Sequence, residues 1–334
     1  MLAYLLYWVA NQNARIMPST EQIARSRSIQ RETGPTFYFA TRLLPDRVRT
    51  GTYVLYGFFR IADDVVDTTA DVDPDRQRDR LESIRDQALG RREAEEPVLA
   101  AFEELRREHE IPDQEIDLFV DAMRSDVEHD HYERYADLEA YMRGSAVAVG
   151  NMMVAIMDVQ EPELATPHAA ALAEAFQLTN FLRDVREDIE KYDRVYLPGE
   201  TLDRYGVTVE QLERGEADQR FARVMETELT RTESLYTEGV AGIGYLPADC
   251  QFGVLLAAVL YAEHHRIIRE RQYDVLSSRP SIPRWRKVSL AAKTWVAWRL
   301  MGDPERVFQR VSGIEPPAET APSSVLAGSR AETR

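Results

Sequence analysis

The sequence is poor in three features that would point to other classes of protein: cysteine, lysine and glycine-rich loops. Its single cysteine, Cys250, excludes an intramolecular disulfide framework and a cysteine-rich metal site, and is typical of a reducing cytoplasm. The 57 Asp and Glu residues outnumber the 41 Lys and Arg residues, and a net charge of −16 argues against binding nucleic acid or an anionic membrane nonspecifically as the main function. Only Lys191, Lys287 and Lys293 are lysines, and this excess of arginine and acid predicts a salt-adapted, halophilic source.

Long hydrophobic segments are also absent. The first ten residues, MLAYLLYWVA, form an apolar run without a preceding positive region or a cleavage site, and a bilayer span needs about 20 apolar residues. Two interpretations stay open for residues 1–16: an upstream extension read from the wrong start codon, or a surface-anchoring turn. Residues 312–334 are rich in Pro, Ala, Ser and Thr and are predicted to be disordered. We therefore expect one domain over 17–311, located in the cytoplasm.

Between these ends, apolar residues recur at helical spacing, and no strand-and-crossover rhythm, internal repeat or linker interrupts them. The sequence predicts an all-α fold. The expected helices cover residues 48–66, 75–89, 97–110, 114–128, 138–157, 167–189, 218–239, 252–271 and 283–301.

Two of these helices carry polar residues where a core helix has apolar ones. In the first, the polar residues follow one another at offsets of 0, 4, 7, 8 and 11, which makes one stripe along a helix. They are Tyr56, Arg60, Asp63, Asp64 and Asp67. The residues beside this stripe are strongly apolar, so we expect the stripe to be enclosed rather than solvated.

The second stripe has the same construction. Gln177, Asn180, Asp184 and Asp188 lie at offsets of 0, 3, 7 and 11, again between apolar neighbours. A single pair of acidic residues four apart is weak evidence in so acidic a chain, and most such pairs lie on exposed faces. Two enclosed stripes are a much rarer coincidence, and their carboxylates need compensating positive charge.

A hard divalent cation can supply that charge. Mg²⁺ prefers carboxylate oxygens and completes its shell with substrate phosphate oxygens, so two acidic helices predict a site for a diphosphate leaving group, with Mg²⁺ or alternatively Mn²⁺. No Walker loop, Ser-His-Asp or Cys-His arrangement competes, and His129, His131, His264 and His265 are expected to be ordinary surface residues. An aromatic, apolar cavity fits an allylic carbocation as the other product of ionisation.

The residues at this point resemble the squalene/phytoene synthase family, and among its members the bacterial and archaeal phytoene synthases. The resemblance covers nearly all of residues 24–300. It rests on four segments: TGPTFYFATRLLP (33–45), YGFFRIADDVVD (56–67), YMRGSAVAVG (141–150) and QLTNFLRDVREDIEKYDRVYLP (177–198). It implies a single all-α domain around a deep central cavity.

The resemblance also implies roles for individual residues. Asp63, Asp67, Asp184 and Asp188, with Asn180, are expected to bind metal, whereas the role of Asp64 is left open. The residues expected to act in catalysis are these five and Tyr56, Arg60, Gln177 and Tyr141. The residues expected to bind substrate are Thr36, Phe37, Arg60, Arg183, Arg194, Tyr196, Val149, Gly150, Tyr261 and Arg279.

Two local features of the motifs have more than one interpretation. The family often has Ser-x-Ser-Phe where this chain has Gly34-Pro35-Thr36-Phe37, and Gly34 cannot supply a hydroxyl to phosphate. The small residues Gly144, Ala146, Ala148 and Gly150 either permit close helix packing or keep the cavity wall open for a long isoprenoid chain, and both can hold.

The implied reaction joins two geranylgeranyl diphosphates head to head, through prephytoene diphosphate, to phytoene. The alternative is a squalene or dehydrosqualene synthase that uses two farnesyl diphosphates, and NADPH is expected only in the squalene case. An alternative of a different class is a noncatalytic partner in a carotenoid-synthesis assembly, which the retained aspartates disfavour. Isoprenoid diphosphates are the expected partners, with peripheral membrane contact and carotenoid-pathway enzymes as further ones and no nucleic acid.

Overall fold

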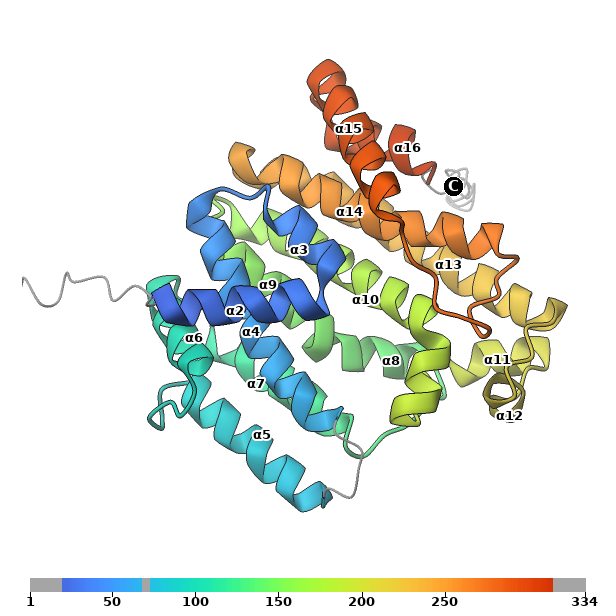
Figure 1. The fold of residues 1–334 in the computed structure, drawn as a ribbon, viewed down its shortest axis with the longest axis horizontal. Coiled ribbons are helices and arrows are strands. Elements are labelled where there is room, and N and C mark those ends of the chain that lie inside the picture. Colours follow the sequence, from blue (N-terminus) through green and yellow to red (C-terminus); the bar gives the residue numbers. More distant parts are fainter. Residues whose placement is uncertain (1–19, 68–72, 315–334) are drawn as a thin grey trace, which may run out of the picture.

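The computed structural model describes residues 20–67 and 73–314, and within these ranges the regular elements are helices (Figure 1). The N-terminal half consists of α2 (Thr20–Thr33), α3 (Pro35–Thr41), α4 (Asp46–Val66), α5 (Pro74–Ala88), α6 (Pro97–Glu108), α7 (Asp113–Ser125), α8 (Tyr135–Met142), the π-helix η1 (Arg143–Val147) and α9 (Ala148–Ile156). The C-terminal half consists of α10 (Pro162–Tyr192), α11 (Gly199–Tyr205), α12 (Val209–Glu213), α13 (Gln219–Ala241), the 3-10 helix η2 (Gly242–Tyr245), α14 (Ala248–Glu270), α15 (Arg284–Met301) and α16 (Pro304–Ser312). The expected all-α fold is confirmed.

Each of the nine expected helices is present. The helix expected over 138–157 contains a π-helical turn between α8 and α9, a distortion that is frequent at functional sites. The helix expected to begin at Pro167 begins at Pro162 instead, because Pro162 occupies the first turn, where a missing N–H costs nothing, and Pro167 lies inside the helix. The sequence did not predict α2, α3, α11, α12 and α16.

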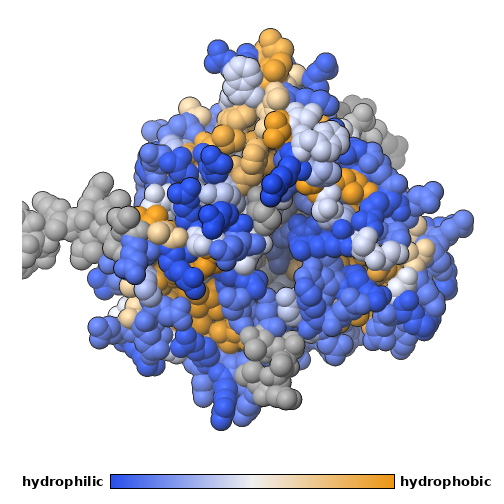
Figure 2. All heavy atoms as spheres, viewed as in Figure 1, coloured by the Kyte–Doolittle hydropathy of each residue, from blue (hydrophilic) through white to orange (hydrophobic). Residues whose placement is uncertain are grey.

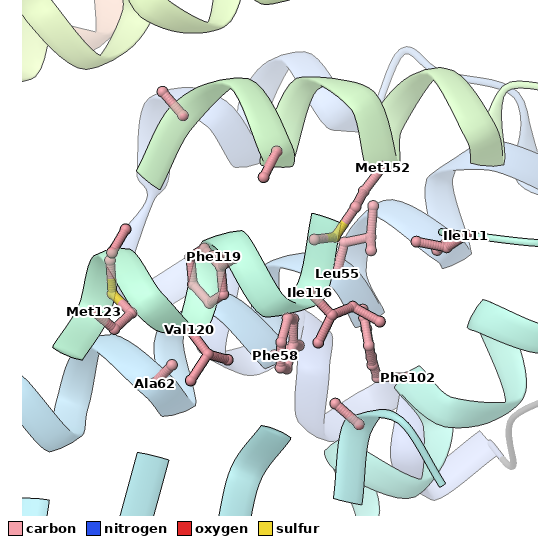
Figure 3. Close-up of a cluster of buried hydrophobic side chains, with 14 of the residues drawn as sticks. Leu55, Phe58, Ala62, Phe102, Ile111, Ile116, Phe119, Val120, Met123 and Met152 are labelled. Atoms are coloured by element: carbon pink, nitrogen blue, oxygen red, sulfur yellow. The ribbon is translucent and has the colours of Figure 1, made fainter. Parts of the chain in front are cut away.

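Helix α10 is the centre of the fold, because it contributes to each of the three buried apolar clusters. Leu178 and Phe181 join the cluster formed mainly by α4 to α9, part of which is drawn in Figure 3. Leu172 and Ala175 join the cluster of α13 to α16, and Leu182 belongs to the third, with residues of α11 to α13. In Figure 1, α10 lies between the N-terminal helices and the layer of α13 and α14.

Glycines allow the helices around α10 to approach closely. A Cβ on Gly144 would lie 2.3 Å from the Leu118 carbonyl oxygen of α7, and one on Gly239 would lie 2.7 Å from the Leu172 backbone of α10. A Cβ on Gly150 would lie 3.0 Å from the Ala169 carbonyl oxygen. The packing interpretation of the small residues in 144–150 therefore holds for both glycines.

No helix in the described part of the chain is long and apolar enough to cross a bilayer. Residues 1–16, with their two open interpretations, and the part of the predicted disordered tail from 315 onward lie outside the described residues. The last described helix, α16, ends at Ser312, where the tail was expected to start.

Candidate active site

A cavity of about 1100 Å³ lies between α3, α4, the α8–α9 segment, α10 and α14. Along α10 its wall changes from small and apolar residues, such as Ala165 and Ala169, to the acidic pair Asp184 and Asp188 near the end of the helix. At a rise of about 1.5 Å per residue these ends are about 35 Å apart along the helix. The cavity thus joins a polar end to a long apolar interior.

All the residues expected from the sequence to form the site lie on the wall of this one cavity. They are Thr36, Phe37, Tyr56, Arg60, Asp63, Asp67, Tyr141, Val149, Gly150, Gln177, Asn180, Arg183, Asp184, Asp188, Arg194, Tyr196, Tyr261 and Arg279. Asp64 does not line it: its side chain is 61% exposed and pairs with Arg60 at 2.6 Å. Ala146 and Gly150 line the cavity, whereas Gly144 and Ala148 do not, so both interpretations apply to Gly150 and only close packing applies to Gly144.

The two acidic motifs are brought together at the ends of α4 and α10 by Arg194. Its Nη2 donates to the Val66 carbonyl oxygen at 3.2 Å, and its Nη1 lies 3.9 Å from a carboxylate oxygen of Asp67. Arg194 follows the end of α10 at Tyr192 and the next residue, Asp193, which has the left-handed conformation with φ of 55°. The guanidinium of Arg194 is therefore the link that holds the end of α4 beside the end of α10.

The four cavity aspartates differ in their partners. Asp67 forms an ion pair with Arg60 at 3.2 Å. Asp184 accepts hydrogen bonds from Arg183 and from Arg279, each of which donates through two guanidinium nitrogens. Among the described residues, the side chains of Asp63 and Asp188 have no hydrogen bond or ion pair.

The unpaired carboxylates are also the most perturbed. Burial, with the nearby charge of Asp67, raises the pKa of Asp63 to about 7. Burial, with the charges of Asp184 and Glu187, raises the pKa of Asp188 well above its ordinary value. A cation bound beside these two carboxyl groups would favour their ionised form and lower both pKa values again.

In the described part of the chain, no group of three or more His, Cys, Asp or Glu side chains is arranged to hold a metal ion by itself. Such a site is still compatible with Mg²⁺, which is usually held by one or two carboxylates and by substrate phosphates. Two unpaired, partly buried carboxylates that line one cavity from α4 and α10 are the donor type that this ion prefers. The residues present therefore fit a magnesium ion that binds together with a phosphorylated substrate.

Aromatic rings form the middle of the cavity wall. Phe181 and Tyr196 stack with ring centroids 3.9 Å apart, and the ring centroid of Tyr141 lies 5.9 Å from that of Tyr196. The ring centroids of Phe176 and of Tyr261 on α14 are 4.6 Å apart. Ring faces in an enclosed cavity attract a cation without reacting with it.

Among the cavity residues that the sequence did not predict, three have notable contacts or pKa values. Asp126, at the end of α7, accepts hydrogen bonds from Tyr141 at 2.8 Å and Tyr196 at 3.3 Å, and burial raises its pKa to about 6. Lys287 of α15 donates to the Thr36 hydroxyl at 2.8 Å, and burial, with the charges of Arg183 and Arg284, lowers its pKa. The rarity of lysine was the one sequence signal that could have drawn attention to Lys287.

The third is His264, for which the sequence prediction was wrong, as it was for His265. Both rings are buried in α14, whereas His129 and His131 are exposed as expected. Burial lowers the pKa of His264 to about 3, and its Nδ1 lies 3.1 Å from the Tyr261 carbonyl oxygen. The reason is that α14 packs against α3, α10, α13, α15 and α16, so polar residues on several of its faces are enclosed.

Gly34 has a structural role where the family pattern has serine. The Tyr56 hydroxyl occupies the adjacent space, where it bonds to the Thr33 hydroxyl at 3.0 Å, and a Cβ on Gly34 would lie 2.6 Å from it. Burial raises the pKa of Tyr56 to about 12, so its hydroxyl stays protonated. The missing serine side chain thus makes room for a phenol at the polar end of the cavity.

Comparison with known proteins gives a consistent result. A family model described as squalene/phytoene synthase matches residues 30–286. The chain is 31% identical over 277 residues to a phytoene synthase of Rhodobacter capsulatus, covering 80% of this chain and 79% of that protein. It is also 31% identical over 280 residues to a phytoene synthase of Arthrospira platensis, covering 78% of this chain and 88% of that protein.

The solved structures agree on the fold. A dehydrosqualene synthase in complex with a ligand superposes with a TM-score of 0.75 and 28% identity, over 84% of this chain and 97% of that chain. A squalene synthase from Alicyclobacillus acidocaldarius superposes with a TM-score of 0.68 and 24% identity, over 76% of this chain and 95% of that chain. This similarity bears on the fold alone.

Proposed function

Because this chain belongs to the squalene/phytoene synthase family, we propose that it is a phytoene synthase, a prenyltransferase that condenses two geranylgeranyl diphosphates head to head. The observation that carries the proposal is the single cavity that joins two acidic helix ends to an apolar interior along α10. The polar end suits diphosphates and the apolar interior suits long isoprenoid chains. The phytoene synthases among the similar proteins support the choice of the C20 substrate.

The polar end would hold the diphosphates through cationic side chains. Arg183, Arg279 and Lys287 line it together, and the two arginines offer planar, bidentate donors that match phosphate oxygens. In the described structure these arginines are engaged by Asp184. A bound diphosphate would replace Asp184 as the anionic partner of these two arginines.

Asp63, Asp67, Asp184 and Asp188 would hold Mg²⁺. When bound, the ion supplies positive charge that stabilises the diphosphate as it leaves. Side chains of the protein would position these groups. Arg60 and Arg194 would keep Asp67 in place, and the carboxylates would orient the diphosphate toward the aromatic part of the cavity.

The aromatic rings and the apolar wall would protect the allylic cation that remains. The stacked pair Phe181 and Tyr196, with Phe176 and Tyr261, surrounds the middle of the cavity and offers ring faces rather than nucleophiles. The 2,3 double bond of the second substrate would attack this cation to form prephytoene diphosphate. A second ionisation, rearrangement and loss of a proton would give phytoene.

A dehydrosqualene or squalene synthase is the second candidate, because a dehydrosqualene synthase is among the most similar solved structures. The deciding experiment incubates the purified chain and Mg²⁺ with geranylgeranyl or farnesyl diphosphate, each with and without NADPH, and identifies the extracted hydrocarbon by mass. We expect phytoene from geranylgeranyl diphosphate without NADPH, and no product after chelation by EDTA. Consumption of farnesyl diphosphate alone would contradict the proposal.

Lipophilic substrates and products also lead us to propose that the protein makes peripheral contact with a membrane. Enzymes that supply geranylgeranyl diphosphate or consume phytoene are the partners that such a reaction requires. A halophilic source stays a prediction from composition.

A further inference from the structure

Helix α15 exposes an apolar face to solvent. Trp285, Val288, Trp295 and Val296 are 70%, 60%, 55% and 49% exposed, and with Ala292 they lie at helical spacing on one side of the helix. We call these five residues the outer face of α15. The opposite side packs on α14 and α16.

An outer face of this kind is unusual for a helix on a protein surface. The exposed side of a surface helix normally carries charged and polar residues, whereas α15 is apolar on both its buried and its exposed sides. Figure 2 shows the result as an apolar strip over the projection formed by α15, on a molecule that is otherwise largely hydrophilic in this view. Exposed tryptophans at this density point to a surface that is covered when the protein works.

The charged residues of α15 itself are all positive. Helix α15, RWRKVSLAAKTWVAWRLM, has five cationic residues and no acidic one, in a chain with a net charge of −16. Arg286 is paired with Glu263 at 2.8 Å, and Lys287 points to Thr36. The other three, Arg284, Lys293 and Arg299, are exposed, and none has an ion-pair partner among the residues that the structure describes.

The helix also begins at the cavity. Ile282, Arg284 and Lys287, at and just before its N-terminal turn, line the polar end. From there α15 leads outward to the projection at the top of Figure 1. A surface bound along α15 would therefore lie next to the polar end of the cavity.

We propose that the outer face of α15 docks on an anionic lipid bilayer, with its tryptophans at the level of the lipid headgroups. Tryptophan, aliphatic residues and flanking Lys and Arg are the composition of helices that lie in the membrane interface. The net charge of the whole chain argues against anionic membranes, but α15 is a local exception with its own unpaired cations. The benefit of docking for substrate entry rests on the proposed function; the docking itself does not.

A second copy of the chain is the competing occupant. If two copies paired through this face, the unpaired cations of one would face those of the other, and like charges across an interface oppose association. An anionic surface removes this conflict, because each cation then has a partner. The observed charges therefore favour lipid over self-association.

The test measures co-flotation of the purified full-length chain, without substrate, with phosphatidylcholine vesicles that contain or lack phosphatidylglycerol. We expect binding that depends on phosphatidylglycerol. Replacing both Trp285→Ser and Trp295→Ser should weaken it by at least about tenfold, and so should Lys293→Glu with Arg299→Glu. The matched controls are Val209→Ser on α12 and Arg223→Glu on α13. Val209 is an exposed apolar residue, and Arg223 is an exposed arginine without an ion-pair partner in the described part of the chain, so both variants should bind like the unchanged chain.

Several outcomes would overturn the proposal. They are the absence of vesicle binding, equal binding by the α15 variants and their controls, and loss of binding only when residues 2–16 are deleted. A dimer that becomes monomeric in the tryptophan variant, measured by light scattering, would assign the face to a second copy. Circular dichroism and thermal melting verify that each variant is folded.

The same preparations separate this proposal from the proposed function. Hydrocarbon formation is measured with substrates dispersed in detergent, where docking is not needed, and the α15 variants should retain it. A chain that binds vesicles but makes no phytoene would contradict the proposed function and leave the docking intact. A chain that makes phytoene but binds no vesicles would contradict the docking proposal and leave the proposed function intact.

Discussion

At the scale of single residues, the cavity distinguishes carboxylates that are held by arginines from carboxylates that are not. Asp67 and Asp184 belong to the first kind, and Asp63 and Asp188 to the second. A carboxylate that is buried without a partner is costly for the folded protein unless a cation joins it. We therefore regard the unpaired residues as the places where a bound metal ion would contribute most.

Asp63→Asn tests this directly. We expect product formation with Mg²⁺ to fall by at least about a hundredfold, because a neutral amide is a poor ligand for this ion. Asp64→Asn is the matched control: it is the next residue, it is exposed and it lies outside the cavity, so its effect should stay within about tenfold. Equal losses in the two variants, or unchanged turnover in Asp63→Asn, would contradict the assignment.

His264 predicts a specific pH dependence of stability. Its pKa of about 3 in the folded chain lies below the ordinary value of 6.5, so the unfolded chain takes up a proton first and stability is lost as the pH falls below about 6.5. Between pH 7 and pH 5 this residue alone should lower the free energy of unfolding by about 2 kcal/mol.

Urea unfolding at the two pH values, with His264→Gln beside the unchanged chain, measures this contribution. The difference in stability between the two proteins should change by about 2 kcal/mol in favour of the variant on going to pH 5. If the stability of the His264 variant falls between pH 7 and pH 5 as much as that of the unchanged chain, the His264 ring does not cause the loss of stability.

Asp126 predicts a large effect from a residue outside the acidic motifs. Asp126→Ala leaves the buried hydroxyls of Tyr141 and Tyr196 without their acceptor and should lower the free energy of unfolding by about 2–4 kcal/mol. Asp126→Asn keeps an acceptor oxygen and should cost less. Chemical denaturation measures both, and equal stability of the two variants would show that the hydrogen bonds are not the cause.

At the scale of elements, the sequence predicts helices well where apolar periodicity runs over several turns. It misses α11, α12 and α16 because five to nine residues carry too short a pattern, and it misses α2 because that helix has few apolar residues. The acidic stripes on α4 and α10 were visible because they repeat at helical spacing. Asp126, Lys287 and His264 were not, because each is a single polar residue whose position depends on how distant helices pack.

Close helix packing gives an element-scale prediction at Gly144. An added methyl group would lie 2.3 Å from a backbone carbonyl oxygen of α7, which cannot move without shifting the helix. We expect Gly144→Ala to lower the free energy of unfolding by about 1–3 kcal/mol. Gly244→Ala is the control, since no atom of the described residues lies within 4 Å of its added methyl group, and a thermal or urea melt should show little change.

At the scale of the whole molecule, we expect the length of the cavity along α10 to determine which isoprenoid chain fits. Ala169 lines the apolar end, far from the aspartates. Ala169→Phe should shorten this end and reduce turnover of geranylgeranyl diphosphate by at least about tenfold, while farnesyl diphosphate, five carbons shorter, is still accepted.

Competition between the two diphosphates, with mass analysis of the C30 and C40 hydrocarbons, measures this change. An unchanged product ratio would show that the apolar end near Ala169 does not receive the isoprenoid chain. Loss of both activities with a reduced melting temperature would instead indicate a folding defect, and Ala169→Leu then provides the smaller substitution with which to repeat the measurement.

The burial of Cys250 has a practical consequence for the whole chain. Its side chain is fully buried, and burial raises the pKa of its thiol to about 11. Because thiolates are the reactive form, the folded protein behaves toward maleimides and similar reagents as if it had no cysteine. A single cysteine introduced on the surface can therefore carry a spin label or a fluorophore at a chosen position without first removing the native one.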